Sequence, residues 1–248
     1  MISVTRPTDL TDTLWIVRIT IVTIFPEFFA SPLDVSLVGT ARQTGALVID
    51  VVDLRSYGLG PHRQVDDAPF GGGAGMVMMV EPLAAALDPL AGTHRILLTP
   101  SGAPLRQTML DRYAEMEAVT LVCGRYEGVD ERVAEHLVDD QVSIGDFVVL
   151  GGEVGALAIV EGVARLLPGV VGNPESLATE SFRGDEGSVP LLEEAQYTRP
   201  AEFRGWEVPA VLLSGDHGAI AQWRRRQRVD RTQARRPDLL PGGEGDLA

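Results

Sequence analysis

The chain has 248 residues, of which 45% are hydrophobic and 23% are charged, so it can bury a core and form one large domain with or without a smaller one. A formal net charge of −14 argues against nucleic-acid binding over the whole surface, so any phosphate contact must come from a local basic patch. The single cysteine, Cys123, excludes an intramolecular disulfide, and the apolar stretch over residues 14–25 is too short to cross a bilayer. We therefore expect a cytoplasmic protein without membrane contact.

Strands and helices are predicted to alternate through the first two thirds of the chain. Runs of β-branched and apolar residues predict strands at five places: 17–25, 46–54, 95–99, 119–123 and 147–150. A long loop is predicted over 55–75. Helices are predicted over 26–42, 80–90, 105–116, 129–137 and 153–167. This alternation indicates an α/β domain with a mainly parallel sheet over residues 1–169, in which 1–12 form a loose extension.

The last third of the chain has a different composition. Residues 170–199 lack periodicity and are rich in Gly, Pro, Ser and Glu, which predicts a flexible linker. A small helical domain is expected over 200–248, and its clearest element is a helix over about 218–236 that Asp216 can cap. Residues 241–248 are expected to form a disordered tail.

Three loops rich in glycine or other small residues follow predicted strands, at 99–102, 123–128 and 151–155. Ligands of open parallel sheets bind outside the carboxyl ends of the strands, where glycines allow a close approach to the backbone. A single loop of this kind is more typical of an ordinary turn than of a ligand site, but three in one domain favour a shared nucleotide-like ligand. The Gly-rich segment 71–75 has neither the Walker nor the dinucleotide-binding spacing, which disfavours an ATPase or a dehydrogenase.

Arginines are concentrated near the C-terminus, where residues 222–240 contain seven Arg and two Asp. Four of them follow the spacing i, i+4, i+7 and i+11 of one helical face: Arg224, Arg228, Arg231 and Arg235. Taken alone, such a face is typical of a solvated helix, and it also suits the binding of phosphates.

Several long motifs occur in series, namely His62–Met76, Cys123–Arg132, Ser143–Phe147, Gly151–Glu153, Tyr197–Pro200 and Val211–His217. In this order, and over about residues 17–240, they resemble the tRNA (guanine-N1) methyltransferase family, TrmD, of the SPOUT superfamily. The resemblance implies an α/β domain with a trefoil knot, and a homodimer in which each active site lies between two subunits. It also implies transfer of a methyl group from S-adenosylmethionine to N1 of the guanosine immediately 3′ of the anticodon in tRNA.

The resemblance carries a set of donor-binding positions onto this chain, motif by motif. They are Leu98, Thr99, Pro100, Gly124, Glu127, Ser143, Ile144, Gly145, Phe147, Val149, Gly151 and Gly152. Two positions in this region depart from the family pattern. Phe147, one of the twelve, stands where Tyr is common, and Leu150 replaces a small polar residue. Glu127 could instead form a surface ion pair with Arg125 or Arg132.

The catalytic positions follow from the same resemblance and from the chemistry of guanine. Its N1 carries a proton at neutral pH, so methylation needs a general base, and the negative charge that develops on O6 needs a cation or donor. The family places the base, an Asp, in the linker before a Ser; here Glu180 precedes Ser181 and is one methylene longer. The alternative is a solvated acid on a linker that has drifted, with Asp185 as the next candidate. Arg165 matches the Arg expected at O6, although it could also interact with a helix C-terminus.

Beside these motifs, tRNA contact is the better interpretation of the basic helix, and the predicted RNA-binding residues are Asp66, Arg199, Arg224, Arg228, Arg231 and Arg235. Asp66 and Asp67 could help hold the magnesium ion to which the family's activity is linked, but two Asp residues alone do not predict a metal site.

Three alternatives to this function stay open. The first is a catalytically impaired SPOUT-type RNA-binding relative, which Glu180 favours and the retained donor motifs disfavour. The second is a related methyltransferase that acts on ribosomal RNA or on a ribose hydroxyl. The third is an unrelated nucleotide-binding α/β protein, which would leave the ordered series of motifs unexplained.

Overall fold

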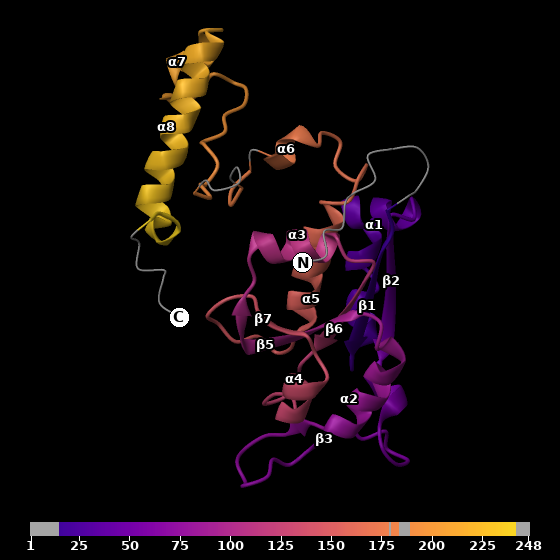
Figure 1. The fold of residues 1–248 in the computed structure, drawn as a ribbon. Helices are drawn as coiled ribbons and strands as arrows, with labels where there is room; N and C mark the ends of the chain where they lie inside the picture. The colour runs from indigo at the N-terminus through magenta and orange to yellow at the C-terminus, as the bar shows by residue number, and fades with distance from the viewer. Residues whose placement is uncertain (1–14, 179, 184–188, 242–248) are drawn as a thin grey trace, which may run out of the picture. The chain divides into compact units, whose positions relative to one another are not determined.

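The computed structural model describes residues 15–178, 180–183 and 189–241 (Figure 1). The chain divides into two compact units between Gly172 and Asn173. The extension expected over 1–12 lies outside the described residues, as does the expected tail apart from Pro241.

The first unit is built on a five-stranded sheet in which all of the pairings are parallel. In spatial order its strands are β2 (Leu47–Asp53), β1 (Val17–Thr23), β6 (Ala118–Cys123), β5 (His94–Pro104) and β7 (Asp140–Ser143). The predicted α/β class with a mainly parallel sheet is therefore confirmed. The strands carry β-branched and apolar residues on both faces, as expected for a parallel sheet that is covered on both sides.

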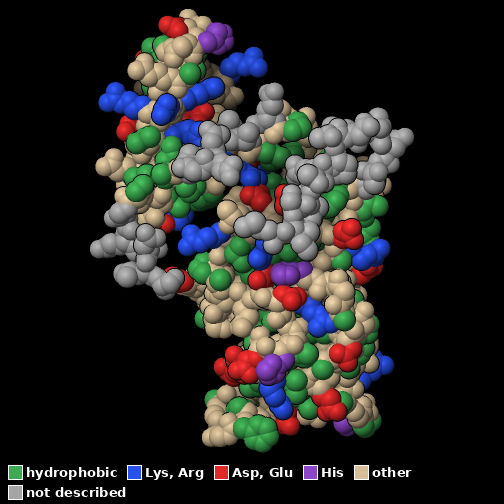
Figure 2. Space-filling view, viewed as in Figure 1, with side chains coloured by type: hydrophobic (Ala, Val, Ile, Leu, Met, Phe, Trp, Pro, Cys, Tyr) green, Lys and Arg blue, Asp and Glu red, His purple; other side chains and the backbone are tan. Residues whose placement is uncertain are grey.

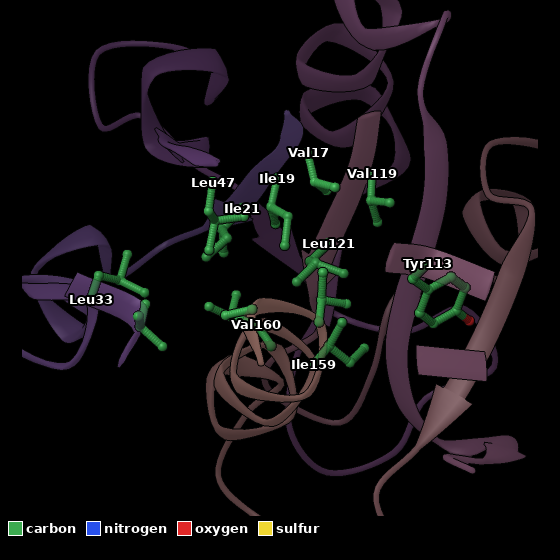
Figure 3. Packing of buried hydrophobic residues seen from close by; sticks show 14 of the residues in the cluster. Val17, Ile19, Ile21, Leu33, Leu47, Tyr113, Val119, Leu121, Ile159 and Val160 are labelled. Atoms are coloured by element: carbon green, nitrogen blue, oxygen red, sulfur yellow. The ribbon is translucent and has the colours of Figure 1, made fainter. Parts of the chain in front are cut away.

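Helices cover both faces of this sheet (Figure 1). On one face lie α1 (Ser36–Gln43), α3 (Gln107–Ala114) and α5 (Glu153–Ala164), and on the other α2 (Val80–Leu87) and α4 (Glu131–His136). Figure 3 shows the first of these cores, where side chains of β1 and β6 meet Ile159 and Val160 of α5. Successive strand residues point to opposite faces, so Ile21 and Val22 belong to different cores.

The strand predicted over 147–150 is wrong, and its place in the sheet is taken by β7. Gln141 and Val142 of β7 pair with Leu97 and Leu98 of β5, so β7 forms the edge of the sheet next to β5. The apolar run that misled the prediction is instead solvent-exposed, with exposed fractions of 82% for Val148 and 89% for Leu150.

Other differences lie at the ends of elements. The helix predicted over 26–42 is wrong in its first half, because two short 3₁₀ turns, Pro26–Phe29 and Pro32–Asp34, precede α1. Each turn begins with a proline, which lacks the N–H that a continuing helix would need. The predicted loop over 55–75 contains β3 (Asp66–Asp67), which pairs antiparallel with β4 (Val77–Met78). β5 runs through the predicted loop 99–102, and its register with β7 shifts between Leu98 and Ala103.

The second unit contains short elements and one long helix. They are α6 (Glu175–Ala178), the hairpin β8 (Glu202–Phe203) and β9 (Trp206–Glu207), α7 (Ala210–Leu213) and α8 (His217–Arg235). The helix α8 begins where the sequence predicts, because the Asp216 carboxylate accepts a hydrogen bond of 3.0 Å from the Ala219 N–H. Residues of the predicted linker are bound to this helix, since the Leu192 N–H donates to Thr232 Oγ1 at 2.9 Å.

Within the described residues, no helix combines the length and apolar character needed to cross a membrane.

Candidate functional site

A cavity of about 330 Å³ lies in the first unit at the carboxyl ends of β6 and β7, beside residues 98–100 of β5, where the register of β5 with β7 shifts. Its volume is within the usual range for small-molecule sites, and this edge of an open parallel sheet is where such ligands bind. Three chain segments line it, namely 98–100, 124–129 and 142–155. The three loops that the sequence singled out therefore meet at one place.

The structure brings eleven of the twelve predicted donor-binding residues to this cavity. They are Leu98, Thr99, Pro100, Gly124, Glu127, Ser143, Ile144, Phe147, Val149, Gly151 and Gly152. Gly145 does not line it but lies in the same wall, where its N–H donates to Ser143 Oγ at 3.2 Å and its φ of 144° suits glycine. Donor binding by these residues stays a prediction.

Backbone segments approach one another closely in the cavity wall. A Cβ atom on Gly152 would lie 2.8 Å from Leu98 Cβ and 2.9 Å from Cys123 Cα, both closer than real Cβ contacts. The Gly152 N–H also donates to the Gly124 carbonyl at 2.9 Å. The position therefore requires glycine, and it fixes the spacing between two walls of the cavity.

Sequence reasoning missed several residues of the cavity. Arg125, Tyr126 and Gly128 belong to the motif that supplied Gly124 and Glu127, so membership of that motif was the available signal. Val142 was missed because the strand was placed at 147–150. The other missed lining residues are Val129, Val148 and Gly155. Leu150, one of the two departures from the family pattern, also lines the cavity.

Glu127 is held against the Gly-rich loop that precedes β4. Its N–H donates to the Met76 carbonyl at 3.0 Å, and Gly75, with a φ of 85°, packs directly on its side chain. The two arginines suggested as its surface partners are bound to other carboxylates, since Arg125 pairs with Glu153 and Arg132 with Asp130. Glu127 pairs with neither of these two arginines, and it lines the cavity.

Asp66 is hydrogen-bonded to Tyr126, and Tyr126 lines the cavity. Burial, followed by the hydrogen bond to Asp66, raises the pKa of the Tyr126 hydroxyl. Tyr126 adopts a φ of 60°, an uncommon backbone conformation for a residue with a large side chain. Asp67 is exposed, and its Oδ1 accepts from the Ala68 N–H at 2.8 Å. Across the described ranges, no group of three or more His, Cys, Asp or Glu side chains could hold a metal ion.

The two predicted catalytic residues belong to different units of the chain. Arg165 is half-buried and follows the last residue of α5, where its N–H donates to the Glu161 carbonyl at 3.3 Å. Glu180 is half-buried in the second unit, and its carbonyl accepts from the Arg183 N–H at 3.2 Å. Asp185, the other candidate base, lies outside the described residues.

The arginine stripe of α8 is not uniformly open to solvent. Arg224 and Arg235 are exposed, whereas Arg228 and Arg231 are half-buried, and their Nε atoms have no hydrogen-bond partner among the described residues. Arg224 Nε lies 3.4 Å from Glu194 Oε1, so the stripe shares a face with the segment that packs on α8.

Further arginines around α8 extend its basic surface, which Figure 2 shows as a gathering of arginine side chains over this helix. Arg225 and Arg226 are both exposed. Arg199 is exposed as well and lines a cavity of about 340 Å³ in the second unit, together with Tyr197 and Trp223. The second unit therefore presents cations on α8 and on the extended segment before it.

The fold and the cavity define an α/β protein with a cavity of small-molecule size at the carboxyl edge of a parallel sheet. The family model described as tRNA (Guanine-1)-methyltransferase TrmD matches residues 17–242. Three similar proteins carry the name tRNA (guanine-N(1)-)-methyltransferase. The one from Gloeobacter violaceus is 54% identical over 228 residues, or 90% of this chain and 98% of that protein. That of a Synechococcus species is 51% identical over 226 residues, or 90% and 87% of the two chains. That of an Anaeromyxobacter species is 52% identical over 227 residues, or 90% of each chain.

The chain therefore belongs to the tRNA (guanine-1)-methyltransferase family, TrmD. The resemblance seen in the sequence motifs is confirmed.

Proposed function

We propose that the protein transfers a methyl group from S-adenosylmethionine to N1 of the guanosine immediately 3′ of the anticodon in tRNA. Membership in the family makes it a tRNA (guanine-N1) methyltransferase. The observation that carries the finer proposal is the gathering of eleven motif residues around one cavity at the carboxyl edge of the sheet.

The residues of the cavity fit the methyl donor. Its volume suits a small molecule, its walls are built from glycine-rich backbone with polar groups, and apolar side chains such as Ile144 and Val149 offer a surface for a base. Glu127 lines the cavity, and its two neighbouring arginines, Arg125 and Arg132, pair with other carboxylates, so its carboxylate can attract the cationic end of the donor. When bound, S-adenosylmethionine supplies the electrophilic methyl group, so this part of the chain only binds and orients.

Glu180 acts as the general base in this proposal. Its carboxylate takes the proton from guanine N1, and the N1 lone pair then forms the bond to the methyl carbon as the carbon–sulfur bond breaks. Arg165 stabilises the negative charge that develops on guanine O6. Glu is one methylene longer than the family Asp. For its carboxylate to reach guanine N1, the backbone at Glu180 therefore lies farther from the guanine than the backbone of an Asp would.

We further infer a trefoil knot in the first unit and a homodimer in solution. Gly102 packs directly against the backbone of Gln141 and Val142, so β7 passes close to the looped part of β5, which supports threading. Exposed apolar side chains in the cavity wall, including Val148 and Leu150, support a second subunit that covers them. Sedimentation of the purified chain tests the dimer.

We assign tRNA contact to the exposed arginines of α8 together with Arg199, and a substrate-facing role to Asp66. Phosphate binding by a local cluster of arginines is compatible with a chain of net charge −14. A tRNA substrate and one buried thiol, Cys123, fit a cytoplasmic location. Parallel assays with added magnesium and with a chelator test the magnesium requirement.

The experiment that tests the proposal is methyl transfer from labelled S-adenosylmethionine to an unmodified tRNA transcript. The transcript carries guanosines at the third anticodon position and at the next position, and a matched transcript replaces the second guanosine by adenosine. We expect N1-methylguanosine only in the first transcript, and a loss of about 100-fold or more in kcat for Glu180→Gln. Methylation at another base, or on a ribose hydroxyl, would overturn the assignment.

A second candidate function is a catalytically impaired RNA-binding relative, which the Glu at position 180 favours. Glu180→Asp separates the two proposals. If the wild type binds donor and tRNA without transferring a methyl group, and Glu180→Asp restores transfer, the impaired relative is correct. If the wild type is active and Glu180→Gln is not, Glu180 is the working base.

A further inference from the structure

A charged side chain is completely enclosed beneath the proposed donor cavity. Glu153 begins α5 and has an exposed fraction of 0%. It does not line the cavity itself, although Gly151 and Gly152 just before it do. An ionised carboxylate at such depth needs compensating partners, and the positive end of the α5 dipole is one of them.

The carboxylate joins parts of the chain that are far apart in sequence. Thr23 Oγ1, at the end of β1, donates to Glu153 Oε1 at 2.8 Å, and the Phe25 N–H donates to Thr23 Oγ1 at 3.0 Å. On the other oxygen, Arg125 Nε and Nη2 each approach Glu153 Oε2 at 2.9 Å. One carboxylate therefore ties the end of β1 and the segment after β6 to the start of α5.

Arg125 is fixed from more than one side. Its guanidinium carbon lies 4.6 Å from the centre of the Phe25 ring, and only 16% of its side chain is exposed. A Cβ atom on Gly151 would collide with the Arg125 side chain, so the glycine leaves the room that the ion pair needs. Arg125 also belongs to the cavity wall, so a shift of its side chain would move the segment from Gly124 to Gly128.

We propose that Glu153 is a positioning residue that holds the donor cavity in its binding shape through Arg125 and Thr23. The inference rests on the proposed function, because it takes the cavity as the methyl-donor site. Glu153→Gln keeps the size of the side chain but removes its negative charge, and Arg125 then faces a neutral amide in a nearly closed space. We expect the segment after β6 to move away from α5, and the cavity to lose affinity for the donor.

A merely structural role would lower stability without changing donor affinity, and the chain offers a matched control. Asp140, the first residue of β7, does not line the cavity and is also bound by several partners. Its Oδ2 lies 2.7 Å from His94 Nε2, accepts from the Tyr113 hydroxyl at 2.9 Å and pairs with Arg112. Asp140→Asn should therefore destabilise the fold and leave the donor cavity intact.

The experiment is calorimetric titration of S-adenosylhomocysteine into the full-length protein, with the melting temperature and the tRNA dissociation constant measured on the same samples. We expect Glu153→Gln to raise the donor dissociation constant by up to about 100-fold. Thr23→Val should raise it by a smaller factor, and Thr23→Ser, which keeps the hydroxyl, should restore it. For Asp140→Asn we expect a lower melting temperature and the wild-type donor affinity, and for all variants tRNA binding within about twofold of wild type.

An unchanged donor affinity in Glu153→Gln, or an equal loss in Asp140→Asn, would overturn the inference. If Glu153→Gln fails to fold, the pair Thr23→Val and Thr23→Ser decides, because equal donor affinities in these two variants would also overturn it. A wild-type protein that binds no donor would overturn the proposed function together with this inference. Donor binding by the wild type with unchanged binding by Glu153→Gln would overturn this inference alone.

Discussion

The first unit collects its donor-binding candidates around one cavity at the edge of a sheet, whereas the second unit spreads its RNA-binding candidates along an extended segment and one helix. In the first unit the spacing between walls is set by backbone contacts, as at Gly152. In the second unit the candidates are long arginine side chains, of which Arg225 and Arg226 are exposed and Arg228 and Arg231 half-buried.

This difference matches two kinds of recognition. A small donor bound by backbone groups depends on geometry, so a few positions should each be indispensable. A polyanion bound by exposed cations depends on the number of charges, so each residue should contribute modestly and in a salt-dependent way. Single substitutions in the two units should therefore have effects of different size.

The largest effect is expected from Gly152→Ala. The added methyl group meets Leu98 Cβ at 2.8 Å and Cys123 Cα at 2.9 Å, so the loop must move away from two cavity walls. We expect donor affinity to fall by about 100-fold, with tRNA binding retained, in calorimetric and filter-binding titrations. Gly92→Ala is the matched control, because a Cβ there meets nothing within 4 Å. Equal donor affinities in the two variants would show that the cavity is not set by these contacts.

A smaller effect is expected from the double substitution of Arg225 and Arg226 by Gln on the exposed part of α8. Removing two phosphate contacts should weaken tRNA binding by roughly tenfold near physiological salt and lower the slope of log K against log salt by about 1.5. Donor affinity should not change. Half-buried Arg228 supplies a contrast with these two exposed arginines, because Arg228→Gln should also lower the melting temperature. A salt slope equal to that of the wild type in the double variant would show that Arg225 and Arg226 do not contact phosphates.

The smallest effect on activity is expected from Asp140→Asn, because Asp140 lies in the first unit but does not line the cavity. Burial raises the pKa of this carboxyl, but hydrogen bonds from His94 and Tyr113 and the charge of Arg112 outweigh it and lower the pKa below 3.8. The stabilisation is thus present above the unfolded pKa of about 4 and is lost as the pH falls through the lower folded value.

Melting curves of wild type and Asp140→Asn between pH 3 and pH 7 check this prediction. We expect the variant to melt a few degrees lower at pH 7 and the two curves to converge at acidic pH, with kcat/KM unchanged at pH 7. A lower kcat/KM in folded Asp140→Asn would contradict the claim that Asp140 stabilises the fold without shaping the cavity.

Most of the architecture could be predicted because periodicity and strand–helix alternation are local properties. β7 could not, because its sequence, Asp-Gln-Val-Ser, has little apolar character, while the neighbouring apolar run over 147–150 is exposed. The position of a strand in a sheet depends on its partners, which a single segment does not reveal.

The sequence motifs predicted most of the cavity residues. They could not predict the role of Glu153, because its partner Thr23 lies 130 residues away in sequence. The arginine stripe illustrates the same limit. The spacing that places Arg224, Arg228 and Arg231 on one face is also the spacing of a packed face, and only the contacts with the segment before α8 distinguish the two.

The most direct test of the account is hydrogen exchange of the full-length protein with and without S-adenosylhomocysteine. We expect ligand-dependent protection in three segments, 98–100, 124–129 and 142–155, with no change along α8. Protection confined to the second unit, or unchanged exchange in all three segments under saturating ligand, would contradict the assignment of the donor site.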